Sequence, residues 1–199
     1  MHMCLQPARN SRSWQRRVRI VLGSALLLAF CVTCSAQSQL ARSDVEAAYL
    51  YDFGKFVEWP PQPELNSAPF TICILGKDDF GRTLDSLIAN EVMRGRTIVA
   101  KRMPTLANSE TCQILYVGAS EQPRMTQDLD ALKDKPILTV SSLAGFMDHG
   151  GMIQFVLADN RVRFEVNLTS AARCHLTLSA ELLKVAVYVN SKPSPEGQP

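Results

Sequence analysis

The pattern of apolar positions predicts strands alternating with helices over the first two thirds of the folded region. Short runs rich in β-branched and aromatic residues predict buried strands at 70–75, 97–99, 112–117 and 137–140. Apolar residues at helical spacing predict helices between them, at about 80–88 and 122–132. We therefore predict an α/β fold, a three-layer sandwich with a mostly parallel, Rossmann-like sheet.

A further helix is predicted ahead of the first strand. Ser43 and Glu46 have the spacing of a capping box, which favours a helix start at Ser43. The apolar stripe predicted for this helix consists of Val45, Tyr49, Phe53 and Phe56. Pro60 and Pro61 must end it, because neither ring nitrogen carries a proton to donate.

The alternation of strands with helices ends near the C-terminus. Residues 152–157 and 162–166 are apolar runs joined by a polar connection, which is typical of an antiparallel hairpin. Asn167 and Ser179 are suited to cap two short helices after it. Asp78 or Asp79 is suited to cap the earlier helix that begins near Phe80.

The first 36 residues have the three parts of a secretory signal peptide in order. A basic region with five arginines and no acid precedes an apolar stretch at 21–34, and small residues favour cleavage after Ala36. The stretch is shorter than the ~20 residues that span a bilayer, which disfavours an uncleaved anchor. We expect a signal peptide at 1–36, one domain at 37–190 and a disordered tail at 191–199.

The twin-arginine route and lipoprotein export are the two alternatives to ordinary secretion. Arg16-Arg17 resembles the start of a twin-arginine signal, but the residues that follow match it poorly. Lipidation needs a small residue directly before the modified cysteine, whereas Phe30 precedes Cys31 and Thr33 precedes Cys34. Ordinary secretion to the periplasm is the route that we expect.

Signal removal changes the charge of the chain. The full chain carries a net charge of +2, but five of its 21 basic residues lie in the signal, whereas all 19 acidic residues follow it. The processed chain is therefore mildly acidic. It has no surplus of positive charge to neutralise phosphates, which disfavours nucleic-acid binding.

Three cysteines remain after processing: Cys73, Cys112 and Cys174. An oxidising compartment favours pairing two of them. Cys73 and Cys112 lie on predicted strands of one sheet, where adjacent strands are about 4.8 Å apart, and a disulfide needs Cα atoms within about 7 Å. We expect a Cys73–Cys112 disulfide; two buried free thiols are the alternative.

Candidate catalytic groups are scarce. His149 lies in a glycine-rich turn, and His175 adjoins Cys174 but would point to the opposite face of an extended chain. No cysteine or histidine pair in the processed chain has metal-ligand spacing. We expect no catalytic residue, no metal, no cofactor and no enzymatic activity.

Several residues are candidates for partner or ligand contacts. Arg94 and Arg96, with Arg161 and Arg163, are the arginine pairs best suited to bind anions, although solvated charge is the simpler interpretation. Trp59 and the apolar stretch 185–189 are candidates for protein docking, and core packing is the alternative for Trp59. In a small-ligand receptor, the anion-binding cleft would be lined by Arg161, Arg163, Arg173 and His175.

The ordered set of short motifs resembles the YfiR family over residues 43–187. The matching segments are 48–60 (AYLYDFGKFVEWP), 72–76 (ICILG), 112–118 (CQILYVG), 138–140 (LTV), 145–146 (GF), 150–153 (GGMI), 161–167 (RVRFEVN) and 182–184 (LLK). Each segment alone is a weak match, but their order is specific.

The resemblance implies a periplasmic, often dimeric protein that represses an inner-membrane diguanylate cyclase by binding its periplasmic sensor domain. It thereby implies a role in cyclic-di-GMP signalling and biofilm regulation, with an outer-membrane lipoprotein and redox state linked to release. Cys73 and Cys112 match a cysteine pair of the family, whereas a second pair near 145–151 is missing here. The alternative function is a periplasmic small-anion or small-ligand sensor; a hydrolase is disfavoured.

Overall fold

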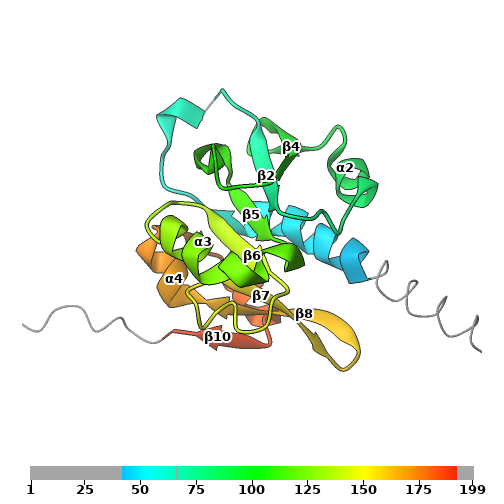
Figure 1. Cartoon of the computed structure of the whole chain (residues 1–199). Coiled ribbons are helices and arrows are strands. Elements are labelled where there is room, and N and C mark those ends of the chain that lie inside the picture. The colour runs from blue at the N-terminus through cyan, green and yellow to red at the C-terminus, as the bar shows by residue number, and fades with distance from the viewer. Residues whose placement is uncertain (1–41, 66, 192–199) are drawn as a thin grey trace, which may run out of the picture. The chain divides into compact units, whose positions relative to one another are not determined.

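The computed structural model describes residues 42–65 and 67–191, shown in colour in Figure 1. The predicted signal peptide at 1–36, the first residues of the predicted domain and all but Ser191 of the predicted tail lie outside the described residues. Among the described residues, no helix has the length and apolar character needed to cross a membrane.

The described part of the first helix covers residues 42–56. The helices after it are α2 (Arg82–Ile88), α3 (Met125–Leu132), α4 (Leu168–Arg173) and α5 (Ala180–Val185), with 3-10 turns η1 (Pro63–Leu65), η2 (Ser109–Thr111) and η3 (Ala119–Arg124). The strands are β1 (Val57–Glu58), β2 (Phe70–Leu75), β3 (Val92–Met93), β4 (Arg96–Met103), β5 (Ile114–Val117), β6 (Leu138–Ser141), β7 (Ile153–Ala158), β8 (Arg161–Asn167), β9 (Thr177–Leu178) and β10 (Tyr188–Asn190).

An eight-stranded sheet of order β10-β8-β7-β6-β5-β2-β4-β3 forms the centre of the fold. The five strands that are adjacent in the order β4-β2-β5-β6-β7 pair in parallel, and β10 also pairs with β8 in parallel. The hairpin of β7 and β8 and the short pair β3–β4 are antiparallel. The predicted α/β class, with a mostly parallel sheet and a C-terminal antiparallel hairpin, is confirmed.

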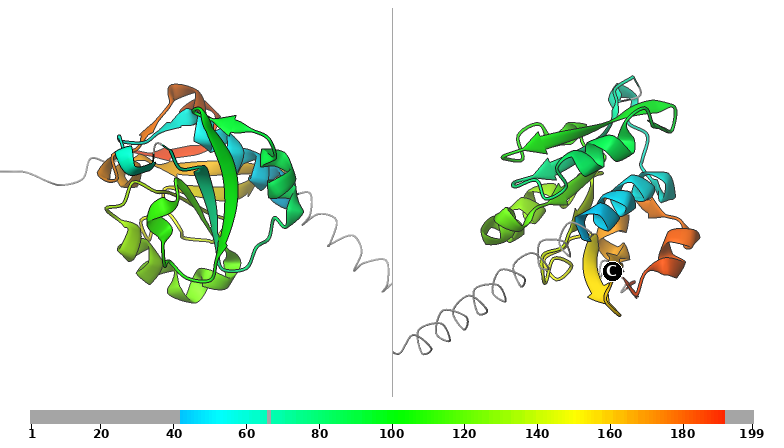
Figure 2. Two further views of the ribbon diagram at one scale, coloured as in Figure 1. Left: turned by 90° about the horizontal axis from the view of Figure 1, so that it is seen from above. Right: turned by 90° about the vertical axis from the view of Figure 1, so that its right-hand side faces the viewer.

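The central strands are buried on both faces, and each face has its own core. Figure 2 shows the helices that lie on the two sides of the sheet. Ile72 and Ile74 of β2 belong to a core shared with the first helix and α2. Cys73 and Leu75, which alternate with them, belong to a second core formed with α3. Because neighbouring side chains of a strand point to opposite faces, one short strand serves both cores and the structure has three layers.

The buried stripe of the first helix differs from the predicted one. Phe53 is fully buried, but Val45 and Phe56 are 42 % and 37 % exposed. The positions that face the sheet are instead occupied by Ala47, Leu50 and Phe53. Apolar residues surround most of this helix, so helical spacing alone could not fix which side faces the sheet.

The contacts of Glu46 explain part of this difference between the predicted and the observed buried side of the helix. Its buried carboxylate accepts hydrogen bonds from Arg42 Nε at 2.7 Å and from Ser142 Oγ at 2.9 Å. Tyr116 also donates to it, over 3.4 Å, and burial raises the pKa of Tyr116. Residue 42 is already helical, so the prediction that the helix starts at Ser43 is wrong. Glu46 connects the helix to the sheet.

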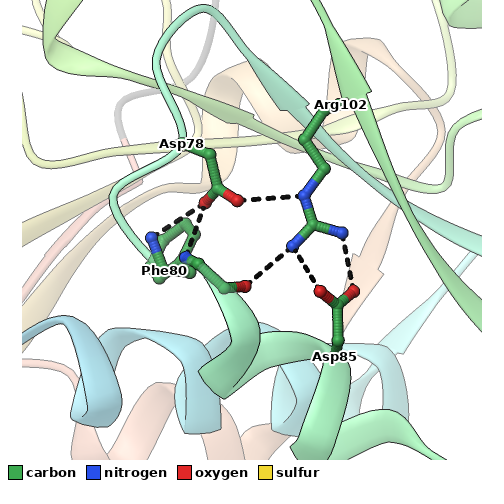
Figure 3. Close-up of polar contacts among 5 residues, drawn as sticks. Asp78, Phe80, Asp85 and Arg102 are labelled. Atoms are coloured by element: carbon green, nitrogen blue, oxygen red, sulfur yellow. Dashed lines mark hydrogen bonds and ion pairs between the residues drawn. The ribbon is translucent and has the colours of Figure 1, made fainter.

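Arg102 holds α2 against β4 (Figure 3). Its guanidinium donates to Asp85 through two nitrogens, at 2.6 and 2.9 Å, and to Asp78 and the backbone oxygen of Gly81, both at 2.9 Å. Asp78 also accepts from the amides of Phe80 and Gly81, so it closes the turn just before α2 rather than capping Arg82 itself. The hydrogen bond that Arg102 donates to Asp85 raises the pKa of Arg102.

The C-terminal half follows the predicted local chemistry. Asp159 and Asn160 have φ of 50° and 58°, as a two-residue type I′ hairpin turn requires. Asn167 accepts from the amide of Ser170 to cap α4, and Ser179 accepts from Leu182 to cap α5. These three features depend on contacts between residues close in sequence.

Other boundaries were shifted or missed. The strand predicted at 97–99 extends to eight residues, and Cys112 precedes β5 instead of belonging to it. The helix predicted from residue 122 begins at Met125, because residues 119–124, with Pro123 among them, form a 3-10 turn. The short strands β1, β3, β9 and β10 have too few residues to show periodicity.

Replacing Phe53 by Ala tests the observed stripe. The Phe53 ring stacks on Phe155 at 5.9 Å and meets Phe164 edge-on at 5.2 Å. We expect F53A to lower the free energy of unfolding by about 3–5 kcal/mol, as measured by urea denaturation. F56A on the same helix is the control and should cost less than about 1 kcal/mol; equal losses would contradict the observed orientation.

Candidate functional site

Cys73 and Cys112 form a disulfide in the structure, with their Cα atoms 5.8 Å apart. Both residues are buried in the core under α3, and Cys112 Sγ lies 3.7 Å from Met103 Sδ. The bond ties β2 to the residues just ahead of β5, within the pair of strands at the centre of the sheet. Its burial protects it from reductants in the folded state.

Cys174 is the free cysteine among the described residues, and it is buried. Its Sγ donates to the backbone oxygen of Lys133 at 3.0 Å, and burial raises the pKa of its thiol. A protonated, buried thiol is a poor nucleophile. His175 is exposed and has φ of 58°, and its amide donates to Ala172 at the left-handed position that ends α4. The two side chains therefore point apart, and the pair has no catalytic geometry.

The four residues proposed for one anion-binding cleft are distributed over two elements. Arg161 and Arg163 lie on β8, the first of them at the hairpin turn. Arg173 ends α4, where its Nε donates to the Lys133 oxygen at 3.1 Å, and His175 follows it. No hydrogen bond between described residues joins the β8 arginines to Arg173 or His175, and their role in binding stays a prediction.

Trp59 lies half-buried just after β1. Its Nε1 donates to the backbone oxygen of Gln113 at 3.1 Å, and its ring meets Phe70 edge-on with centroids 5.4 Å apart. Arg94 stacks over the indole, with Cζ 5.8 Å from the ring centroid. These contacts support packing against the core; a partner contact through the exposed part of the ring stays a prediction.

Arg94 lies in the turn between β3 and β4, and Arg96 is the first residue of β4. Arg94 donates to the Val57 oxygen at 2.6 Å, and Arg96 donates to the oxygens of Ala68 and Pro69, each also at 2.6 Å. Arg96 Nη2 also lies 3.4 Å from Gln113 Oε1. Burial lowers the pKa of Arg96, because no carboxylate compensates the desolvation of its charge.

The structure therefore brings together two sets of residues that the sequence treated separately, the candidate anion-binding arginines and the candidate docking tryptophan. Gln113, which connects them, was missed. The only signal for it is a polar residue beside a run of buried apolar positions. We refer to Trp59, Phe70, Arg94, Arg96 and Gln113 as the Trp59 cluster. It lies where β2, β4 and β5 begin.

At the carboxyl ends of the central strands, opposite the Trp59 cluster, the protein itself fills the space. Chain order reverses between β2 and β5, and ligands of open α/β sheets bind outside the carboxyl ends of the strands at such a point. Here a Cβ on Gly76 would lie 2.3 Å from Glu121 Oε1 and from Ser120 Oγ. The buried Glu121 carboxylate, paired with Arg124, fills the space and disfavours a phosphate there.

His149 forms a hydrogen bond that resembles the contact between a nucleophile and a catalytic base. Thr126 Oγ1 lies 2.9 Å from His149 Nδ1, and both residues are exposed. A catalytic base is normally oriented through its second nitrogen, and no described residue bonds to His149 Nε2. Across residues 42–65 and 67–191, no group of His, Cys, Asp and Glu side chains is arranged to hold a metal ion.

The C-terminal segment exposes three apolar side chains. Val185, Val187 and Tyr188 are 53 %, 48 % and 53 % exposed. They lie at the end of α5, at the start of β10 and between the two, and among the described strands β10 is the one at this end of the sheet, where it pairs with β8. We refer to Val185, Val187 and Tyr188 as the C-terminal patch. Such a surface is typical of protein docking.

Taken together, the fold and these surfaces define a small α/β protein suited to binding. The chain belongs to the YfiR/HmsC-like family, whose profile matches residues 43–187. That range includes both the Trp59 cluster and two of the three residues of the C-terminal patch.

Two solved structures are similar over part of their length. One is a conserved domain protein of Vibrio cholerae O1 biovar El Tor, with 10 % identity, a TM-score of 0.44, and 60 % of this chain and 54 % of that chain covered. The other is the ABC domain of Streptococcus pneumoniae in complex with L-Trp, with 16 % identity, a TM-score of 0.41, and 63 % and 58 % covered. The chain spans little more than half of each, and at these TM-scores neither supports a conclusion about function.

The disulfide generates a stability prediction. The variant C73S/C112S should lose about 3–4 kcal/mol of unfolding free energy, because the bond closes a loop of 39 residues in the unfolded chain. Urea denaturation measures this, and a reductant added with urea should lower the wild-type midpoint to that of the variant. C174S is the control and should remain sensitive to reductant. Peptide mapping without reduction should recover Cys73 linked to Cys112; their recovery as separate thiols would contradict the bond.

Proposed function

We propose that this protein is a periplasmic binding protein that negatively regulates an inner-membrane diguanylate cyclase by binding its periplasmic sensor region. The observation that carries the proposal is the family match over residues 43–187. In this function the protein lowers cyclic-di-GMP and limits biofilm formation, and it is not an enzyme. Secretion through a cleaved signal at 1–36 places it in the periplasm.

The C-terminal patch is the docking surface that we propose for the cyclase. About half of the surface of each of its three side chains is open to solvent, and burying such apolar surface stabilises a complex by about 25 cal/mol per Å² before the cost of association.

Two further partners belong to the proposal. A homodimer and an outer-membrane lipoprotein that relieves repression are both expected from the family resemblance.

The buried disulfide supports a structural role for Cys73 and Cys112 in this regulator, since thiol–disulfide exchange requires access of a thiolate to the bond.

Gene deletion with complementation tests the function. Deleting the gene should raise cellular cyclic-di-GMP and biofilm mass, and the wild-type gene should restore both. V187E should fail to restore them, because a charge would be buried in the interface. V92E is the matched control, since Val92 is 59 % exposed on β3 at the other end of the sheet.

Direct binding tests the surface. The wild type and V92E should retain the periplasmic domain of the cyclase in a pull-down, whereas V187E should lose at least tenfold in affinity. Equal melting temperatures would show that V187E is folded. Unchanged cyclic-di-GMP after deletion would overturn the function; full binding by V187E would overturn only the surface.

A further inference from the structure

We propose that the Trp59 cluster is a binding site for a small organic carboxylate. The proposal goes beyond the regulatory function, since it concerns a ligand bound by the isolated protein. It rests on one buried donor without a partner, two uncompensated guanidinium groups and an aromatic side chain that lie together where the central strands begin.

The unpartnered donor is the side-chain amide of Gln113. This residue is 2 % exposed, and its Nε2 has no hydrogen-bond partner. Its orientation is fixed, because Oε1 accepts from the amide of Thr71 at 2.7 Å and faces Arg96 Nη2 at 3.4 Å. Exchanging the two atoms of the amide would place donors against donors. A buried donor left unpaired costs about 1–3 kcal/mol, and native proteins rarely retain one without a reason.

The charge of the cluster favours an anion. No acidic side chain among the described residues pairs with Arg94 or Arg96, whose hydrogen bonds go to backbone oxygens and the neutral Gln113 amide. Elsewhere in the described chain, Arg42, Arg102 and Arg124 are each paired with a carboxylate. The positive charges of these two arginines are therefore not balanced by a carboxylate of the described residues, and Arg96 is half-buried whereas Arg94 is exposed.

The geometry favours a carboxylate over a larger anion. Arg96 Nη2 lies 3.4 Å from Oε1 of the same amide group that carries the unpartnered Nε2, so two donors lie in one small region and suit the two oxygens of one carboxylate. Trp59 offers the face or edge of an indole to the rest of the ligand, so an apolar body attached to the carboxylate is favoured. Because Gln113 Nε2 is buried, the ligand reaches it by displacing a neighbouring side chain.

The test is titration of the isolated protein with benzoate, acetate and the neutral isostere benzamide. Trp59 is the one tryptophan after residue 36, so its fluorescence in the processed protein reports on the cluster directly. We expect a saturable change with benzoate, a weaker response with acetate and at least tenfold weaker binding of benzamide. Benzoate should also raise the melting temperature.

Variants assign the site. Q113E keeps the acceptor for the Thr71 amide but replaces the donor by a negative oxygen that pairs with Arg96, so benzoate binding should be lost while the fold is kept. R96Q should weaken binding at least tenfold. R82Q is the matched control, because Arg82 is an exposed arginine at the start of α2, and its affinity should equal that of the wild type.

Three results would overturn the proposal. They are no saturable response to either carboxylate, equal binding of benzoate by Q113E and the wild type at equal melting temperature, and a preference for inorganic phosphate over benzoate. The first would mean that an internal water satisfies Gln113. None of them bears on the cyclase proposal, which is tested with the partner and without carboxylates.

Discussion

Burial of the central strands on both faces is the constraint on which the rest of the structure depends. β2, β5 and β6 have no face toward solvent, so each must be covered twice. The first helix and α2 cover one face, and α3 covers the other. The buried Glu46 network and the Arg102 ion pairs fix the helices of the first face, whereas the disulfide lies in the core of the second. What remains accessible is the two ends of the strands and the two edges of the sheet.

These accessible regions are unequal, and their differences explain where binding is expected. The carboxyl ends of β2 and β5 are filled by Glu121 and Ser120, so the usual ligand position of an open α/β sheet is closed. The beginnings of the strands keep unpaired positive charge and a buried amide. The region of β10 keeps exposed apolar side chains. The two proposed sites, one for a ligand and one for a protein partner, therefore lie in different parts of the molecule.

Local chemistry made much of the fold predictable. The strands of the central sheet, the hairpin turn at Asp159-Asn160 and the caps at Asn167 and Ser179 each depend on residues close in sequence. The rotation of the first helix was not predictable, because the partners of Glu46 are Tyr116 and Ser142, far along the chain. Edge strands of two or three residues are defined by their neighbours rather than by their own pattern.

The same limit applies to the candidate site. The sequence selected Trp59, Arg94 and Arg96 for their side-chain chemistry, but only parallel pairing of β2 with β4 and β5 places them together. It also grouped Arg161, Arg163, Arg173 and His175, which the fold distributes between the hairpin and the end of α4. The pairing of Cys73 with Cys112 was predictable because it needed only adjacent strands, not a detailed surface.

The pairing of β1 with β9 has a consequence for how the chain is made. Val57 lies opposite Leu178, so the segment that ends the first helix finds its partner only when nearly all of the described chain is present. Contacts between residues so far apart slow folding and leave early intermediates with exposed apolar surface. During synthesis or translocation, the first helix therefore emerges long before its final neighbour. β9, which emerges late, therefore completes the anchorage of a segment that emerges early.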